Sequence, residues 1–193
     1  VIAINPRHAP KEIYNKILQT IDKPTLIIEN KLDYTRKDTP KKFKGSYKYY
    51  KNNLPIYDLK YSIIKENPDI TVVCWGGLVY ELEEIINDLT EKEEIIVEMI
   101  IPTMLYPLNI KSVKDSVLRT KKILIIEDES SFATLSSEII ALLSGTNNDF
   151  FSVQLNTADD IIPSSKLLEE NHYVSKQEIY DEMKRLFLLW VQK

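Results

Sequence analysis

Polar residues follow apolar runs at several points of this sequence where a ligand could bind. The pair Gly76-Gly77 comes directly after the apolar run at residues 70–75. A glycine turn between a strand and a helix can hold a phosphate on its backbone N–H groups. The surrounding residues match neither G-x-G-x-x-G nor G-x-x-x-x-G-K-[ST]. An ordinary turn is therefore the favoured interpretation, and phosphate binding is the alternative.

Carboxylates follow a second apolar run. Glu127-Asp128-Glu129 come after residues 123–126 and could bind a cation. They also precede a predicted helix, where acidic side chains complement the helix dipole and cap free N–H groups. The structural role is favoured here. The pair Asp159-Asp160 is ambiguous in the same way.

Nucleophiles and metal ligands find little support in the sequence. Cys74 is the only cysteine and has apolar neighbours, so we expect a small core residue. His8 and His172 lie far apart, without metal-ligand spacing. Four serines lack a G-x-S-x-G context and a nearby histidine: Ser130, Ser131, Ser136 and Ser137. We therefore assign no catalytic, cofactor-binding or metal-binding residue.

The totals fit a globular protein. The chain has 193 residues, of which 44% are hydrophobic, so disorder is not expected. No stretch is long and apolar enough to cross a bilayer, and no signal-peptide pattern opens the chain, so we expect a cytoplasmic protein with no membrane partner. The first residue is Val1, not Met, and it already lies in an apolar run. We therefore expect a fragment that begins inside a fold.

Strands and helices are predicted to alternate through the second half. Helical periodicity is present at residues 78–89, 110–120 and 132–143, and Ser175 with Glu178 has the spacing of a capping box. Short apolar runs between these helices predict strands at residues 70–75, 95–101, 123–126 and 151–155. This order predicts a three-layer α/β/α fold with a mostly parallel sheet.

The first third has a different character. Residues 1–67 carry 14 Lys and Arg against 7 Asp and Glu, and residues 68–193 carry 11 against 22. Residues 1–29 resemble the last strand–helix–strand of an α/β domain. Residues 30–68 are rich in Lys and Tyr, and we interpret them as a linker or crossing segment. A nucleic-acid surface is the weaker alternative, because the whole chain is acidic, so no nucleic-acid partner is expected.

Residues 97–128, VEMIIPTMLYPLN followed by IKSVKDSVLRTKKILIIED, resemble a known family. They are similar to the C-terminal domain of the β subunit of thiamine-diphosphate-dependent 2-oxo-acid dehydrogenases of the pyruvate and branched-chain type. In that family a strand leads into a pattern like Asp-Leu-Arg-Thr-(Ile/Leu)-x-Pro-(Leu/Met/Trp)-Asp, then a helix and a strand ending in Glu. Thr103, Pro107 and Glu127 match this pattern, with Asn109 in place of the Asp.

Other segments resemble the family in the same order along the chain. PTLIIENKLDY at residues 24–34 places Glu29 and Tyr34 at matching positions. Further resemblances lie at residues 53–64, 70–81, 136–143 and 158–179. This sequence departs from the family at Pro102, where the family has Arg, and at Ala158, where it has Gly. The departures suggest a divergent paralogue.

The resemblance implies a division into three parts. Residues 1–29 would end a pyrimidine-binding domain, residues 30–68 would link it, and residues 69–193 would form a transketolase C-terminal-like domain. The full-length enzyme would use thiamine diphosphate and Mg²⁺, and this fragment would bind neither. Its partners would be a homodimer mate, an α subunit or fused α-like domain, and in some complexes a lipoyl transacylase.

We therefore expect a role in subunit assembly and partner docking within an oxidative decarboxylation of a 2-oxo acid, and no activity from the fragment alone. Two alternatives stay open. The chain could be the same domain of a transketolase-like synthase, or a stand-alone non-catalytic α/β interaction module.

Overall fold

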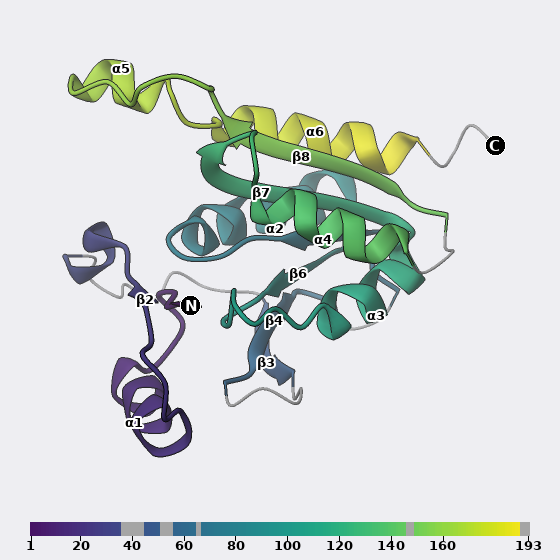
Figure 1. The fold of residues 1–193 in the computed structure, drawn as a ribbon. Coiled ribbons are helices and arrows are strands. Elements are labelled where there is room, and N and C mark those ends of the chain that lie inside the picture. Colours follow the sequence, from purple (N-terminus) through teal and green to yellow (C-terminus); the bar gives the residue numbers. More distant parts are fainter. Residues whose placement is uncertain (36–44, 51–55, 65–66, 146–148, 190–193) are drawn as a thin grey trace.

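A computed structural model describes residues 1–35, 45–50, 56–64, 67–145 and 149–189. Figure 1 shows its main body, a twisted six-stranded sheet with helices on both faces. The strands follow the order β3-β4-β6-β5-β7-β8. Their bounds are β3 Ser46–Tyr50, β4 Asp58–Ser62, β5 Ile70–Val73, β6 Val97–Ile101, β7 Lys122–Ser130 and β8 Phe151–Thr157. The four strands from β5 to β8 pair in parallel, and β3 and β4 add an antiparallel edge. The three-layer fold with a mostly parallel sheet is thus confirmed.

The helices divide between the two faces of the sheet. The helices that cover the sheet are α2 Leu78–Glu93, α3 Lys111–Thr120, α4 Leu135–Ser144 and α6 Lys176–Leu188. The short helix α5 Lys166–Glu170 lies between β8 and α6 and projects away from the sheet (Figure 1). Apolar residues of β7 contribute to the core on both faces of the sheet, because successive strand residues point to opposite sides. Leu124 and Ile126 pack in the core under α2 and α6, whereas Ile123 and Ile125 pack in the core under α3 and α4.

Local sequence signals fix several helix ends. The capping box at Ser175 and Glu178 is present as predicted. Thr134 caps α4 by accepting a hydrogen bond from the backbone N–H of Ser137. This helix was predicted to begin at Phe132, but Phe132 is exposed and α4 begins three residues later. The difference arises because β7 runs on to Ser130, beyond its apolar residues.

The predicted linker at residues 30–68 contains regular structure. It includes a 3₁₀ helix, η1 Lys31–Tyr34, and the antiparallel strands β3 and β4, which join the main sheet. The strand β4 lies within residues 53–64, which resemble a short strand of the family, whereas β3 was not expected from the sequence. Residues 36–44, 51–55 and 65–66 lie outside the described residues. The polar sequence of β3 hid a strand because an edge strand needs no apolar run.

The N-terminal segment packs against the exit of β6. It comprises β1 Ile2–Ala3, α1 Pro10–Thr20 and β2 Ile27–Ile28, and the two strands pair in parallel. The backbone N–H of Ala3 donates to the carbonyl of Thr103, and that of Leu105 donates to the carbonyl of Val1. The bend after Pro102 thus places backbone groups where β1 can pair with them.

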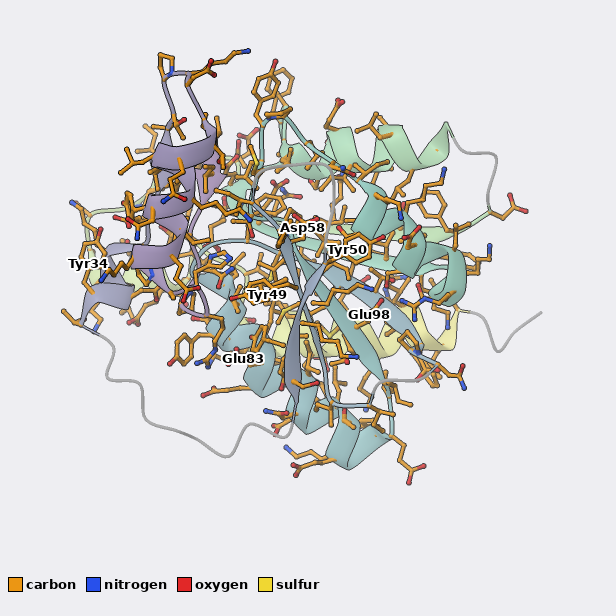
Figure 2. The ribbon with its side chains drawn as sticks, turned by 90° about the horizontal axis from the view of Figure 1, so that it is seen from below. Tyr34, Tyr49, Tyr50, Asp58, Glu83 and Glu98 are labelled. Atoms are coloured by element: carbon orange, nitrogen blue, oxygen red, sulfur yellow. The ribbon has the colours of Figure 1, made fainter. Side chains whose placement is uncertain are left out.

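A buried ion pair joins this segment to α2. Arg7 donates through Nε and Nη2 to the two carboxylate oxygens of Glu83, at 2.7 and 2.6 Å. Glu83 is fully buried and also accepts a hydrogen bond from the hydroxyl of Tyr47 on β3. The guanidinium lies 4.5 Å from the ring centroid of Tyr80. Hydrogen bonding to Glu83 raises the pKa of Arg7 further above its already high value. Figure 2 shows Glu83 on the ribbon near the β3–β4 edge.

This pair yields a stability prediction. Arg7→Met should lower the free energy of unfolding by about 3–5 kcal/mol, because the charge of Glu83 would stay buried without its cation. Arg7→Met combined with Glu83→Leu should recover most of that loss. Urea denaturation measures both variants.

The exposed pair Lys176–Glu84 supplies the control. Lys176→Met should cost less than about 1 kcal/mol, since water already screens this pair. If Arg7→Met lowers the free energy of unfolding no more than Lys176→Met does, the Arg7–Glu83 contact does not stabilise the fold as predicted.

Candidate functional site

The parallel strands create a switch point between β5 and β7. The chain passes from β5 to β6 on one side and from β6 to β7 on the other, so the crossovers diverge there. Open α/β sheets bind ligands at such a point, beyond the carboxyl ends of the strands. Gly76 and Gly77 follow β5 at this place, and Gly76 has a φ of +63°, which favours glycine.

A hollow of about 370 Å³ lies beside this switch point. We call it the switch-point hollow; its wall is formed by Asn30, Leu32, Gly77, Leu78, Glu81, Asp128, Glu169, Tyr173 and Val174. The side chain of Asn30 lies directly over Gly77, where an added Cβ would come within 1.9 Å of Asn30 Nδ2. Glycine is thus needed at position 77 for the N-terminal segment to approach the sheet.

Carboxylates dominate the switch-point hollow. Asp128 is exposed at the surface, but neighbouring atoms remove part of the hydration of its carboxyl. This loss of hydration raises the pKa of the carboxyl to about 6, and repulsion from Glu81 and Glu129 adds to the increase. No group of three or more His, Cys, Asp or Glu side chains among the described residues could hold a metal ion. The hollow therefore has the charge of a cation site without the ligand geometry of a metal centre.

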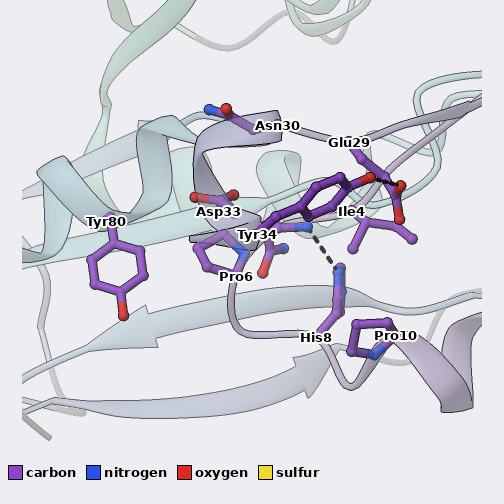
Figure 3. A pocket seen from close by; sticks show the side chains of 10 residues that line it. Ile4, Pro6, His8, Pro10, Glu29, Asn30, Asp33, Tyr34 and Tyr80 are labelled. Carbon is purple, nitrogen blue, oxygen red and sulfur yellow. Dashed lines mark hydrogen bonds between the residues drawn. The ribbon is translucent and has the colours of Figure 1, made fainter. Parts of the chain in front are cut away.

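A second hollow, of about 290 Å³, lies between the N-terminal segment and α2 (Figure 3). We call it the junction hollow; its lining residues are Ile4, Asn5, Pro6, His8, Pro10, Glu29, Asn30, Asp33, Tyr34 and Tyr80. Asn30 lines both hollows. Tyr80 reaches the junction hollow from α2, and the remaining residues come from the N-terminal segment and η1.

His8 forms a buried bridge at the junction hollow. Its Nδ1 accepts from the backbone N–H of Asn5 at 3.3 Å, and its Nε2 lies 3.2 Å from Thr103 Oγ1. Because Nδ1 accepts, Nε2 carries the proton and donates to Thr103, whose hydroxyl donates to the carbonyl of Tyr57. Burial lowers the pKa of His8 to about 4. The imidazole is therefore neutral at pH 7 and acts as a structural link.

Glu29 and Tyr34, which occupy positions that match the family, contact each other in the structure. The hydroxyl of Tyr34 donates to Glu29 Oε2, and the hydroxyl of Tyr14 donates to Oε1 at 2.9 Å. Figure 3 shows Glu29 beside the Tyr34 ring at the junction hollow. Both residues thus form part of its wall.

The acidic run near the end of β7 splits between two roles. Glu127 is buried and accepts hydrogen bonds from Ser136, at the start of α4, and from Asn156 Nδ2 at 2.9 Å. This contact agrees with the predicted capping role, although Glu127 lies on a strand. Asp128 points to the opposite face and lines the switch-point hollow. Asp159 and Asp160 line neither hollow.

The other candidate groups take structural positions. Cys74 is fully buried beside Met99, and burial raises the pKa of its thiol well above the usual value. Ser136 is buried against Glu127, and Ser137 contributes its N–H to the α4 cap. His8 and His172 are not brought together in either hollow.

The tyrosines of the Lys- and Tyr-rich segment, residues 30–68, mostly contact other parts of the same chain. Tyr47 donates to Glu83 and Tyr50 donates to Asp115, while Tyr49 is exposed. Figure 2 shows Tyr49 and Tyr50 along β3. Arg36, Lys37, Lys41, Lys42, Lys44 and Lys51 lie outside the described residues. The packing of Tyr47 and Tyr50 agrees with the favoured interpretation of this segment.

Sequence reasoning missed the residues that define the junction. Asn5 and Arg7 occur in a turn without a recognisable motif, and Glu83 lies among other acidic residues of an amphipathic helix. One signal was available: Glu83 interrupts the apolar face of α2, because it is one residue past Leu82 and three before Ile86. A buried glutamate on such a face requires a cationic partner elsewhere in the fold.

The lowered pKa of His8 makes stability depend on pH. In the unfolded chain a histidine binds a proton below about pH 6.5, whereas folded His8 stays neutral down to about pH 4. The unfolded state therefore binds more protons in this window, and stability falls as the pH falls through it. The loss attributable to His8 should approach about 3 kcal/mol at pH 4.

Urea denaturation of the wild type and His8→Gln between pH 7 and pH 4 measures this difference, since carboxylates common to both proteins cancel. His172→Gln is the matched control, because it removes the other histidine. Parallel curves for the wild type and His8→Gln over the whole window would contradict the prediction.

Known proteins resemble this chain in sequence. A 169-residue alignment with the pyruvate dehydrogenase E1 component subunit beta of Cyanidium caldarium is 25% identical and covers 85% of this chain and 48% of that protein. The corresponding subunit of Acholeplasma laidlawii is 28% identical over 106 residues, covering 52% of this chain and 32% of that protein. The chain thus spans about half or less of the length of these curated relatives.

Solved structures share the fold. A split-gene transketolase, described as an inactive beta4 tetramer, aligns with a TM-score of 0.57 at 20% identity, covering 67% of this chain and 42% of that chain. A 2-oxoglutarate:ferredoxin oxidoreductase from Magnetococcus marinus aligns with a TM-score of 0.50 at 17% identity, covering 72% and 20%.

No helix among the described residues is long and apolar enough to cross a membrane. The family model for the transketolase C-terminal domain matches residues 59–179, more than half of the chain, beginning within the segment predicted as a linker. With its parallel sheet, its helix-covered faces and this match, the chain belongs to the transketolase C-terminal domain family.

Proposed function

We propose that this chain is the assembly-supporting part of a thiamine-diphosphate-dependent 2-oxo-acid dehydrogenase, equivalent to the C-terminal portion of a β-like subunit. The alignment with a pyruvate dehydrogenase β subunit, which covers 85% of this chain but 48% of that protein, carries the proposal. The proposed division is residues 1–29 as the end of a pyrimidine-binding domain, residues 30–68 as a connection and residues 69–193 as the C-terminal domain.

The chemistry of the described residues agrees with a supporting role. Both hollows are lined by carboxylates, and no Lys or Arg lines either of them within the described part of the chain. A diphosphate needs cationic or N–H donors, or a metal ion held by carboxylates. In the complete enzyme, thiamine diphosphate would supply the carbanion chemistry and its Mg²⁺ would neutralise the diphosphate. The residues described here would orient subunits around that site.

An exposed apolar arm offers a surface for assembly. The segment from β8 to α6 projects from the body and carries α5 (Figure 1). Ile161 and Leu167 on this arm are 88% and 69% exposed. Exposed apolar groups of this kind mark interaction surfaces when they cluster. We assign the arm to contact with a second copy of the subunit. An α subunit and a lipoyl transacylase are the further proposed partners, and the cytoplasm is the proposed location.

The first experiment tests cofactor binding. Thiamine diphosphate with Mg²⁺, titrated calorimetrically into the 193-residue chain, should give no saturable heat, because neither hollow provides cationic donors. Pyruvate decarboxylation by the chain alone should also be absent. Stoichiometric binding accompanied by turnover would contradict the proposal.

The second experiment tests the arm. The chain should sediment as a dimer, and Ile161→Lys with Leu167→Lys should shift it to a monomer while the thermal unfolding midpoint changes little. Leu18→Lys is the matched control, because Leu18 is 80% exposed but lies on α1. If the arm variant and the control sediment alike, the arm does not mediate self-association.

The fold similarity to a split-gene transketolase favours a second candidate, the same domain of a transketolase-like synthase. Assays of the complete protein with its partner distinguish the two. Turnover of 2-oxo acids with an acyl acceptor supports the dehydrogenase, and ketol transfer between sugar phosphates supports the synthase. A stand-alone interaction module would show neither activity.

A further inference from the structure

A buried polar group in the junction hollow lacks a hydrogen-bond partner. Asn5 is 2% exposed and lines the hollow. Its Oδ1 accepts from the backbone N–H of Arg7 at 2.9 Å, which fixes the orientation of the amide. Its Nδ2 makes no hydrogen bond within the described part of the chain. Because buried donors are almost always satisfied, this N–H group calls for an acceptor from outside the described residues.

The ring nitrogens of His8, which also lines the hollow, are already engaged in hydrogen bonds. The Nδ1 of His8 accepts from the backbone of Asn5, and its Nε2 is hydrogen-bonded to Thr103. Among the described residues that line the hollow, the Asn5 amide is therefore the buried donor that remains available. An entering carbonyl or hydroxyl oxygen would satisfy it.

The charge of the hollow selects the rest of the ligand. Among the described residues, Glu29 and Asp33 line it and no Lys or Arg does, and His8 is neutral at pH 7. An anion such as a carboxylate or phosphate would meet two negative side chains, whereas an organic cation would be attracted. Tyr34 adds an aromatic wall, which also favours cations (Figure 3), whereas the ring of Tyr80 already lies against the guanidinium of Arg7.

We propose that the junction hollow binds an organic cation that also carries a carbonyl oxygen, with the carbonyl on Asn5 Nδ2 and the cation beside Glu29. The ligand class is that of arginine or lysine derivatives, either as a free metabolite or as a basic residue of a partner polypeptide. The site goes beyond the proposed dehydrogenase role and does not depend on it.

Four probes separate the two required features. Argininamide has both the cation and the carbonyl, acetamide has only the carbonyl, guanidinium has only the cation, and acetate is an anion. In ¹H–¹⁵N spectra of the labelled full chain, argininamide should shift the Asn5 side-chain amide saturably and bind most tightly. Acetamide should shift the same signal more weakly, and acetate should not bind. The signal is assigned by its loss in Asn5→Leu.

A matched pair of variants tests the donor. Asn109 also accepts from a backbone N–H two residues on, that of Lys111, but lies away from the hollow. Asn5→Leu should weaken argininamide binding about tenfold, the effect of one net hydrogen bond. Asn109→Leu should leave it unchanged. Thermal unfolding checks that each variant is folded.

A second pair tests the charge and remains informative if Asn5→Leu does not fold. Glu29→Gln should weaken argininamide binding and leave acetamide binding unchanged. Glu12→Gln removes an exposed charge on α1 and should change neither. The blocked tripeptide acetyl-Ala-Arg-Ala-amide should bind more tightly than argininamide if a partner chain supplies the group, and less tightly if the ligand is a free metabolite.

Three results would overturn the proposal. An Asn5 amide signal that responds to none of the probes would leave water as the only occupant of the hollow. Equal binding of acetate and argininamide would remove the charge argument. Unchanged argininamide affinity in both Asn5→Leu and Glu29→Gln would place the binding elsewhere.

Discussion

One buried ion pair determines how the two parts of this chain fit together. Arg7 in the N-terminal segment and Glu83 on α2 are 76 residues apart and bond through two nitrogen–oxygen contacts. A carboxylate on the apolar face of a helix is strongly unfavourable without a cation. The segment must therefore dock where Arg7 meets Glu83, and that docking brings His8 to Thr103 and creates the junction hollow.

The residues that match the dehydrogenase family act through this architecture. The hydroxyl of Thr103, at the exit of β6, accepts a hydrogen bond from His8. Glu127 accepts one from Ser136 at the start of α4, and Glu29 accepts one from Tyr34. Each is a polar group hydrogen-bonded to a partner distant in the fold or in the adjoining turn, although Glu127 Oε2 has no partner among the described residues. Such groups tolerate few replacements, because a change would leave the partner unsatisfied.

The layered fold could be predicted from the sequence, but the two hollows could not. Apolar runs such as that of β5 and the periodicity of α2 depend on local patterns that a sequence displays directly. By contrast, β3 is polar because it lies at an edge, and no local pattern indicates its pairing with β4. The hollows depend on contacts between distant turns, such as Asn30 over Gly77, which no single window contains.

The side chain of Asn30 separates two cavities. It borders both hollows and rests on the backbone of Gly77, while its Oδ1 accepts from the N–H of Leu32 and so shapes the first turn of η1. A methyl group at position 77 would come within 1.9 Å of Asn30 Nδ2, so the amide would have to leave its place between the two hollows. The wall that the hollows share thus depends on the absence of a side chain at a single residue.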